Sequence, residues 1–553
     1  MKKNSNTVCA ATLYYLIEWE DKDKIQKVVC GERYMTKKID AMTSWVETNK
    51  DFLKICFASV LFWGIAAHGF MFMHWNLSHD SLWQFYSADG SWRYSLGRIF
   101  VPFYAWLFRR SLTIPWLVGI YALTWLFLTV IAVCSIFSIK SKRNIFLVAG
   151  ALVTNECVIA LTGTYLSDLD CDMFALLLAT TAVICWKRDK GKGSLLFSAV
   201  LLSLSLGFYQ SYLSVAVTLV LMVLILELFN KKNETQVIYS GLRALVMFVC
   251  SGLLYVFWLK CAQMITGVSL VEDSYNSLTS PLHSSFSGIL RNTVLGWANT
   301  IYSFIRTPSL YGKWISSALN VTVFLFCVLL FALCLHSCEL NRKQKLFGCV
   351  LFLLIPIGMD VSFVLAGFSH DLMHYAYCFF QVFLLLLLVF WKPVQQNVSD
   401  SGTSKKSIIL FIAYISVSLS LLGNVITSNA FYVKKDLEAK ATLSLFTRIA
   451  DRIESMDGYE PGETPVVFVG HPDNLLDPIP GFENLYRITG GGIRSASNIY
   501  YMEYFEYVLQ RPINVLDADD NIQKQEAVLS MPAFPDQGCV QWFDGKLIVK
   551  LAN

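Results

Sequence analysis

The chain has 553 residues, of which 55% are hydrophobic, 14% aromatic and only 16% charged, and its mean hydropathy is +0.49. These values exclude an ordinary soluble domain and are typical of a protein that crosses a membrane many times. The formal net charge of +4 says little about partners, and no nucleic-acid partner is expected.

The N-terminal 51 residues are mostly polar and precede the first long apolar stretch. A cleavable signal peptide would carry its apolar segment much nearer the start. We therefore expect residues 1–51 to form an N-terminal tail.

Eleven apolar segments follow, most of them near the length of about 20 residues that a helix needs to cross a ~30 Å hydrocarbon core. Segments 173–186 and 194–208 are short, and could be half-buried or tilted helices. The sequence therefore predicts an α-helical polytopic membrane protein with about 11 transmembrane helices in a domain over residues 52–430. The predicted spans are 53–73, 112–138, 144–163, 173–186, 194–208, 211–229, 241–260, 315–335, 346–367, 373–391 and 407–428.

Lysine and arginine are concentrated in alternate loops and in the N-terminal tail. Short cytoplasmic loops carry an excess of these residues, so the pattern predicts a cytoplasmic N-terminus and an extracytoplasmic C-terminal segment. The basic loops contain Lys140, Lys142, Arg143, Lys187, Arg188, Lys190, Lys192, Lys231, Lys232, Arg342, Lys343, Lys345, Lys392, Lys405 and Lys406.

The first outer loop, residues 74–111, combines many aromatic residues with charged ones. Its tryptophans and tyrosines are typical of an aromatic belt at the membrane interface. Asp80 has no such structural need, and a carboxylate there could act on a lipid headgroup or a sugar. The segment Ile99–Phe108 is too short to span and is predicted to be an amphipathic helix along the outer interface. Arg109 and Arg110 follow it, against the trend of basic loops inside.

Three carboxylates, Asp168, Asp170 and Asp172, occur at alternate positions in the second outer loop. In an extended stretch they would share one side and could hold a divalent cation. Alternatively, Asp170 or Asp172 caps the start of the following helix. Asn155 and Glu156 lie within the third predicted span, and an ionisable residue at that depth is usually functional or faces a wet cavity.

Polar residues also occur at two further outer turns. Tyr209 and Gln210 interrupt the apolar run between the fifth and sixth spans, where a sugar hydroxyl or a helix carbonyl could be the partner of Gln210. His370 and Asp371 lie between the ninth and tenth spans. Each histidine alone is more often a satisfied interface residue than a ligand, but the group adds polar side chains to the outer face.

The C-terminal segment, residues 431–553, has the composition of a small α/β domain. Residues 437–456 are helical by periodicity, and strands are expected at 465–469 and 547–551. Lys434 and Lys435 lie just beyond the last span. They could form a solvated charge run, or could bind a lipid phosphate at headgroup depth.

These residues suit transfer of a sugar on the outer face. Nucleotide sugars are cytoplasmic, so an outer site needs another donor, and a lipid-linked donor fits. A carboxylate can deprotonate an acceptor hydroxyl, and cations or hydrogen-bond donors can stabilise the leaving phosphate.

Several short motifs resemble the glucosyl transferase GtrII family, whose members are multispanning glycosyltransferases of the GT-C type. The resemblance extends over roughly residues 55–550, and its motifs are Ser78-His79-Asp80-Ser81, Ser95-Leu96-Gly97-Arg98, Asn155-Glu156, Asp172 with the Ala/Leu run behind it, Phe208-Tyr209-Gln210-Ser211-Tyr212 and the strand at 465–470. It implies a bacterial cytoplasmic-membrane enzyme that moves a glucosyl or similar residue from a polyprenyl phosphate, such as undecaprenyl phosphate, to a surface polysaccharide such as O-antigen.

In related enzymes the first outer loop carries the catalytic acid, which corresponds here to Asp80. Such loops often show adjacent carboxylates, whereas His79 precedes Asp80, so His79, Asp89 or Asp172 could assist. Arg98, Lys434 or Lys435 would stabilise the departing phosphate, and Glu156, Asp172, Tyr209 and Gln210 would line the sugar site. The alternatives are a transporter or flippase of a lipid-linked sugar, for which no internal repeat is visible, and a non-catalytic assembly partner.

Overall fold

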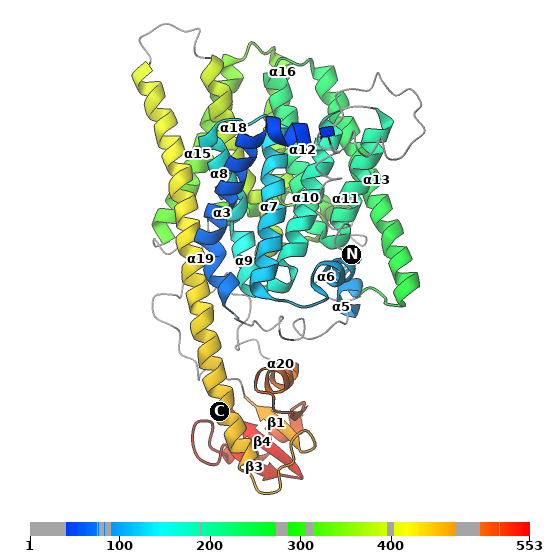
Figure 1. Ribbon diagram of the computed structural model, residues 1–553, viewed down its shortest axis with the longest axis vertical. Coiled ribbons are helices and arrows are strands. Elements are labelled where there is room, and N and C mark those ends of the chain that lie inside the picture. Colours follow the sequence, from blue (N-terminus) through cyan, green and yellow to red (C-terminus); the bar gives the residue numbers. More distant parts are fainter. Residues whose placement is uncertain are drawn as a thin grey trace.

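The computed structural model describes residues 40–41, 43–74, 76, 82, 90–188, 191–271, 286–305, 313–394, 403–470, 498–518 and 520–552. In these parts of the chain it consists of a large helical bundle and a small C-terminal domain that contains the β-sheet (Figure 1). The longest helix joins the two.

All eleven predicted apolar segments are helical, although some are broken into two helices. The predicted interface segment before Arg109 is also a separate short helix, α6. The helices of the bundle are α3 (Lys50–Met73), α5 (Ser91–Ser95), α6 (Val101–Arg109), α7 (Pro115–Phe137), α8 (Lys142–Val153), α9 (Glu156–Thr164), α10 (Leu166–Lys187), α11 (Lys192–Phe208), η1 (Gln210–Tyr212), α12 (Leu213–Phe229), α13 (Glu234–Thr266), α14 (Phe286–Ile305), α15 (Lys313–Ser337), α16 (Arg342–Met359), α17 (Val361–Ala366), η3 (Asp371–Met373), η4 (Tyr375–Cys378), α18 (Phe379–Val394) and α19 (Thr403–Glu454).

Seven helical segments within the described residues are long and apolar enough to cross a membrane. The pair α8 and α9, bent by 44° at its break, makes an eighth if it is one span. Helix α11 and residues Tyr375–Trp391 are apolar but shorter. Helix α16 begins with Arg342 and contains Pro356, so its uninterrupted apolar part is short. The chain is therefore a helical membrane protein, and its described residues contain fewer clear spans than the eleven predicted.

Helix α10 lies at the centre of the bundle. Nearly every residue from Leu166 to Trp186 is buried, and the helix packs against α7, α11 and α12. Because α10 is surrounded on all sides, the polar residues in its first turns are also enclosed by protein.

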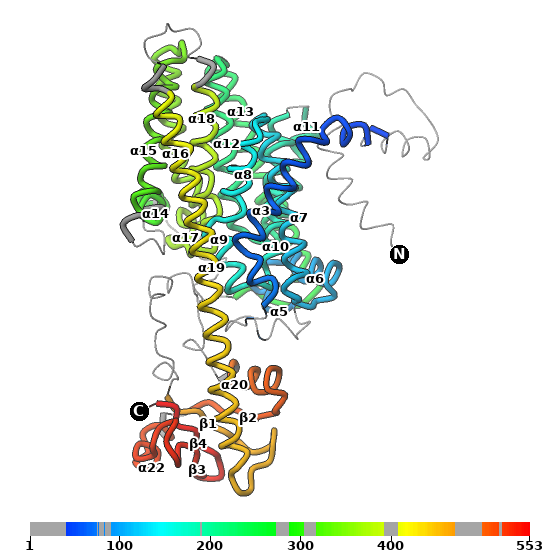
Figure 2. The backbone as a smooth tube through the Cα atoms, turned by 60° about the vertical axis from the view of Figure 1, so that its left-hand side comes forward, coloured from blue at the N-terminus to red at the C-terminus, as the bar shows by residue number. Residues whose placement is uncertain are grey.

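Helix α19 is continuous over 52 residues and leaves the bundle to enter the C-terminal domain (Figure 2). The domain boundary expected at residue 430 thus falls inside one helix. The helix predicted at 437–456 is the last part of α19, which ends at Glu454.

The C-terminal domain contains a four-stranded sheet in the order β2-β1-β4-β3. Strands β1 (Pro465–Val469) and β4 (Lys546–Lys550) confirm the two strands that the sequence predicts, and they pair in parallel. Two shorter strands were not predicted: β2 (Asn514–Leu516), parallel to β1, and β3 (Val540–Phe543), antiparallel to β4. The remaining elements are α20 (Asn498–Glu503), the π-helical turn η9 (Tyr504–Val508), α21 (Asp520–Gln523) and α22 (Glu526–Ser530).

Side chains on β1 and β4 alternate between two small cores, as expected of a sheet covered on both faces. Val466 and Leu547 pack with Phe446 of α19, whereas Val467 and Ile548 pack with Val528 of α22. The sheet is thereby fixed to the end of α19.

Candidate functional site

The three carboxylates of the predicted second outer loop lie inside a helix. Helix α10 begins at Leu166 with Tyr165 at its N-cap, so Asp168, Asp170 and Asp172 occupy its first two turns. The expectation of an extended stretch is therefore wrong, and neither Asp170 nor Asp172 caps the helix. Residues four apart share a helical face and those two apart do not, so Asp168 and Asp172 are on one side and Asp170 on another.

Asp168 binds two arginines from the end of the first predicted outer loop. Arg93 of α5 and Arg98 both pair with its Oδ2 atom, Arg98 at 3.1 Å from Nη1. Burial opposes the charge on Arg98, but its pKa is raised because the Tyr209 hydroxyl and the Asp168 and Asp172 carboxyls lie nearby. The end of the first loop is therefore fixed to the start of α10.

Asp170 faces the opposite side and pairs with Arg109 at the end of α6. Arg109 Nε lies 3.0 Å from Asp170 Oδ2, and Arg109 Nη2 donates to the Ser167 carbonyl at 2.7 Å. This pairing accounts for a basic residue in a loop that the sequence predicts to be on the outer side, where the charge trend predicts none.

The break between α11 and α12 is held against the same loop end. The guanidinium of Arg98 lies 4.5 Å from the centre of the Tyr209 ring. Gln210 Nε2 donates to the Tyr255 hydroxyl at 2.8 Å and to the Leu96 carbonyl at 3.3 Å. The sequence suggested a sugar hydroxyl or a helix carbonyl as the partner of Gln210, and the structure shows a backbone carbonyl, that of Leu96. We call the set Arg93, Arg98, Arg109, Asp168, Asp170, Asp172, Tyr209 and Gln210 the outer cluster.

Asp172 lies at the inner edge of the outer cluster and is 2% exposed. Arg98 and Asp168 are within its electrostatic range. The hydroxyl of Tyr212, also close to Asp172, is buried and has no hydrogen-bond partner among the described residues. An unsatisfied buried hydroxyl beside a carboxylate is a polar position that a bound ligand or water could use.

Glu156 lines a polar cavity of about 60 Å³ deeper in the bundle. It is the first residue of α9, whose N-cap Asn155 accepts a hydrogen bond from the Val158 amide at 3.2 Å. The cavity is wide and polar enough to hold water. Cys157 is within electrostatic range of Glu156 and also of Asp172, which places the cavity next to the outer cluster. Its other lining residues are Asn155, Ser303, Asn320, His374, Tyr377, Cys378, Gln381, Ser420 and Asn424.

Sequence reasoning missed Asp360, a carboxylate that is 1% exposed at the break between α16 and α17. Its Oδ2 atom accepts hydrogen bonds from Ser369 at 2.8 Å and Tyr377 at 3.0 Å. His374 Nε2 lies 2.9 Å from Ser369 Oγ, so this network positions a histidine at the wall of the Glu156 cavity. The sequence did contain a signal for this residue, because Asp360 lies inside the predicted span 346–367. As argued for Glu156, an ionisable residue at that depth is usually functional or faces a wet cavity.

His370 and Asp371 are in the turn that leads to this histidine. His370 is exposed, and Asp371 Oδ1 lies 3.7 Å from His374 Nδ1. The backbone carbonyl of Leu372 accepts from Cys157 Sγ at 3.0 Å, which joins the turn to α9. The turn therefore reaches the cavity mainly through His374.

Lys434 and Lys435 are 7% and 3% exposed on α19, so they do not form a solvated charge run. Lys434 pairs with Glu438 at 3.6 Å, and the Lys435 ammonium is 6.0 Å from the Phe431 ring. Phe431 itself packs against Gly163 near the C-terminal end of α9. Both lysines are thus enclosed near the same end of the bundle as the outer cluster.

His79, Asp80 and Asp89 lie outside the described residues. Leu82, in the same loop, is fully buried in the core of the C-terminal domain with Phe446, Tyr500 and Tyr504. The first loop therefore contacts that domain two residues after Asp80.

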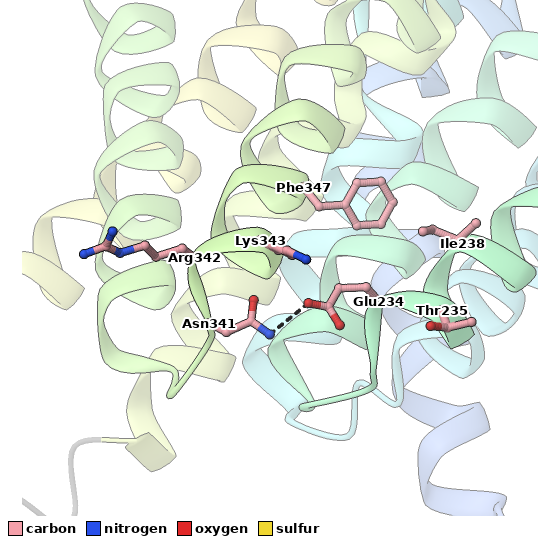
Figure 3. A pocket seen from close by; sticks show the side chains of 7 residues that line it. All are labelled: Glu234, Thr235, Ile238, Asn341, Arg342, Lys343 and Phe347. Atoms are coloured by element: carbon pink, nitrogen blue, oxygen red, sulfur yellow. Dashed lines mark hydrogen bonds between the residues drawn. The ribbon is translucent and has the colours of Figure 1, made fainter.

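Two larger hollows lie elsewhere on the bundle. An apolar groove of about 1030 Å³ runs between α3 and α7. A pocket of about 730 Å³ lies between the starts of α13 and α16, where Asn341 Nδ2 donates to Glu234 Oε1 at 2.8 Å and Lys343 points toward the same carboxylate (Figure 3). This pocket is at the opposite end of the bundle from the outer cluster, because α12 runs away from the cluster before α13 begins.

No group of three or more His, Cys, Asp and Glu side chains within the described residues is arranged to hold a metal ion. The divalent cation considered for Asp168, Asp170 and Asp172 thus has no preformed site there. Asp168 and Asp170 instead form ion pairs with arginines.

Comparison with known proteins gave one family. The profile described as Glucosyl transferase GtrII matches residues 69–379, which is more than half of the chain. The match includes the whole outer cluster, Asp360 and the Glu156 cavity wall as far as Cys378. No curated protein and no solved structure matches the chain.

Proposed function

Because this chain belongs to the glucosyl transferase GtrII family and is a membrane glycosyltransferase, we propose that it moves a glucosyl or similar residue from a polyprenyl-phosphate donor, such as undecaprenyl phosphate, to a surface polysaccharide such as O-antigen. The reaction takes place on the outer face of a bacterial cytoplasmic membrane. The chain crosses that membrane about eleven times with its N-terminus in the cytoplasm.

The observation that carries this proposal is the pairing of Arg98 with Asp168 at 3.1 Å. This contact, together with that of Arg93, holds the end of the first loop on the central helix. It brings the loop that contains Asp80 to the same end of the bundle as Asp172, Tyr209 and Gln210. A base, a cation and polar groups for a sugar are thus provided at one end.

In the proposed reaction, Asp80 takes the proton from a hydroxyl of the acceptor polysaccharide. The hydroxyl oxygen attacks the anomeric carbon and forms the new glycosidic bond with inversion. The bond from the anomeric carbon to the phosphate oxygen breaks, and the polyprenyl phosphate leaves with its electron pair. His79, Asp89 or Asp172 assists Asp80.

The leaving phosphate needs positive charge where its own charge develops. Arg98 is the first candidate, because one edge of its guanidinium binds Asp168 and its face covers Tyr209. Lys434 and Lys435, on the helix that leads to the C-terminal domain, are further candidates. Glu156, Asp172, Tyr209 and Gln210 bind the sugar, and Asn155, Asp168, Asp170, His370 and Asp371 support that site.

The proposed reaction divides the chain into three regions. Residues 1–51 form a cytoplasmic tail and 52–430 the transmembrane catalytic domain. Residues 431–553 form a domain on the outer face, where it contacts the first loop through Leu82.

The test uses purified protein in lipid with a radiolabelled polyprenyl-phosphate glucose and a panel of surface polysaccharides, comparing wild type with Asp80→Asn. We expect the wild type to transfer label and the variant, which folds and inserts normally, to transfer none. Transfer by the variant at the wild-type rate would remove Asp80 from the role of base. Movement of the labelled lipid across vesicles without product would instead support a transporter.

A further inference from the structure

The groove between α3 and α7 runs along the outside of the bundle and is almost entirely apolar. It has a volume of about 1030 Å³ and extends from Leu61 to His74 on α3 and from Ile114 to Leu123 on α7. Such a volume is at the upper end of the range for small-molecule sites, ~300–1,000 Å³. The groove is therefore large enough for a sizeable apolar ligand.

The groove covers one leaflet of the membrane. The α3 wall from Leu61 to Met73 corresponds to roughly 18 Å at 1.5 Å per residue, about half of a ~30 Å hydrocarbon core. Its His74 end coincides with the end of α3, where the first loop begins. The groove thus lies in the leaflet next to the outer cluster.

Two glycines give the groove its depth. At Gly119 a Cβ atom would be 2.6 Å from the Phe72 ring, so the α7 backbone packs directly on that ring and forms a closed floor. At Gly69 the nearest atom to a Cβ would be Ile65 Cγ2 at 3.5 Å, so the space in front of Gly69 is open. A side chain added at Gly69 would project into the groove without moving the backbone.

The end of the groove next to the first loop is lined by a polar residue, His74. His74 Nδ1 bonds the Phe70 carbonyl at 2.7 Å, and its ring stacks on Phe70 with centroids 3.9 Å apart. Arg110 is exposed at the end of α6, four residues before Ile114. A ligand with a long apolar tail and an anionic head group would place its tail in the apolar groove and its head group near His74 and Arg110.

We propose that the α3–α7 groove binds the polyprenyl chain of the lipid-linked sugar donor, with the donor phosphate at the mouth beside His74 and Arg110. The proposal rests on the proposed function. The polypeptide runs directly from the α3 wall of the groove into the loop that contains Asp80. A donor held in the groove therefore presents its sugar to that loop. A single groove suits the one apolar chain of a polyprenyl phosphate, whereas a phospholipid has two acyl chains.

The first test compares two glycine variants in lipid nanodiscs. Gly69→Leu fills the groove, and Gly252→Leu adds the same side chain on α13, where a Cβ would meet nothing within 4 Å. The quantity measured is kcat/KM for a long-chain donor divided by that for a short-chain donor. We expect Gly69→Leu to lower this ratio by about tenfold, the loss when roughly two methylene groups leave their contacts, and Gly252→Leu to leave it unchanged. Equal ratios in all three proteins would overturn the proposal.

The second test does not depend on activity. A photoactivatable polyprenyl phosphate without sugar is crosslinked to the wild type, and labelled peptides are identified by mass spectrometry. We expect label in residues 61–74 and 114–123, removed by excess polyprenyl phosphate but not by phospholipid. Label elsewhere, or label that phospholipid removes equally, would refute the groove assignment. Labelling of the groove without any sugar transfer would retain the groove and reject the proposed function.

Discussion

Arg109 Nε lies 3.0 Å from Asp170 Oδ2, and neither side chain is more than 3% exposed. The pair joins the short helix α6 to the central helix α10. Two charges this deep in the protein are stable only together, since either one alone would be buried without compensation.

We therefore predict that Asp170→Asn destabilises the protein by about 3–5 kcal/mol. The double variant Arg109→Met/Asp170→Leu should recover much of that loss, because an apolar pair of similar volume leaves no buried charge. Thermal unfolding of the detergent-purified proteins measures both effects. A double variant less stable than Asp170→Asn would show that the remaining contacts of Arg109, chiefly with the Ser167 carbonyl, matter more than its charge.

Arg98 should be needed for transfer beyond its contribution to folding. If it stabilises the leaving phosphate, Arg98→Ala should lower kcat by about 10²–10³-fold, and Arg98→Lys should restore part of the rate because it keeps the charge but not the planar fork. Arg143 offers a matched control, since its guanidinium also lies on a tyrosine, 3.6 Å from the Tyr414 ring, near the opposite end of the bundle. Equal losses of activity in Arg98→Ala and Arg143→Ala would indicate a structural effect only.

Glu156→Gln tests the buried cavity. The variant keeps the shape of the side chain but loses its charge, and a charged hydrogen bond contributes about 1.5–3 kcal/mol. We expect KM for the donor to rise by roughly 10–100-fold with an unchanged melting temperature. Glu227→Gln, which removes a carboxylate paired with Lys232 near the other end of the bundle, should leave KM unchanged. A wild-type KM for Glu156→Gln would exclude this residue from the sugar site.

The helices and the main strands were predictable because they depend on local pattern. Every span that was predicted from an apolar run is helical, and the strand predicted from the Pro-Val-Val-Phe-Val run is β1, with the same bounds. The break at Tyr209 was also predicted, from polar residues within apolar sequence, whereas the break at Asn155 falls inside the single span predicted at 144–163. The number of clear spans was less predictable, because α16 starts with charged residues and α11 is short.

The ion pairs of the outer cluster could not be predicted, because they join residues about 60–75 positions apart. The predicted span begins only at Met173, so the sequence predicts Asp168 and Asp170 in a loop or at a helix start, whereas both are buried inside α10. Arginines from α6 and the first loop make that position possible by pairing with them. Similarly, Lys434 and Lys435 were compatible with a solvated charge run or with a lipid-phosphate site, and the structure excludes the first by enclosing both along the continuous helix α19.

The C-terminal domain should lose stability as the pH rises. Burial, with a smaller contribution from neighbouring Glu506, raises the pKa of Glu503 from 4.5 to about 7. Between pH 4.5 and about 7 the folded state therefore keeps a proton that the unfolded chain has released, so folding is favoured most below pH 4.5 and is weakened progressively as the pH rises to about 7.

Glu503→Gln should accordingly stabilise the domain at pH 8 and leave it unchanged at pH 4. Because Glu503 is only half buried, screening by solvent reduces the expected gain to about 1 kcal/mol. Hydrogen exchange of residues 498–508 in the full-length protein, followed by mass spectrometry, measures this. The exposed Glu526, in the same domain, provides the matched Glu→Gln control. A gain of the same size at pH 4 would mean that packing, not ionisation, is responsible.

Leu82 should couple the C-terminal domain to catalysis. Its side chain is fully buried among Phe446, Tyr500 and Tyr504, and it follows the proposed base Asp80 by two residues. Leu82→Ala creates a cavity in that contact, which costs about 2–5 kcal/mol when the site cannot collapse. Because the loop would then leave the domain, we expect kcat to fall by more than about tenfold, with little change in the melting of the bundle.

Val528→Ala is the control that separates this effect from general damage to the domain. Val528 is buried on the other face of the sheet with Val467 and Ile548, in a different core from Leu82. It should destabilise the domain, less than Leu82→Ala because fewer carbon atoms are removed, and it should leave kcat near the wild-type value. If the two variants lower kcat equally, the domain acts through its overall stability and Leu82 has no special part in positioning the loop.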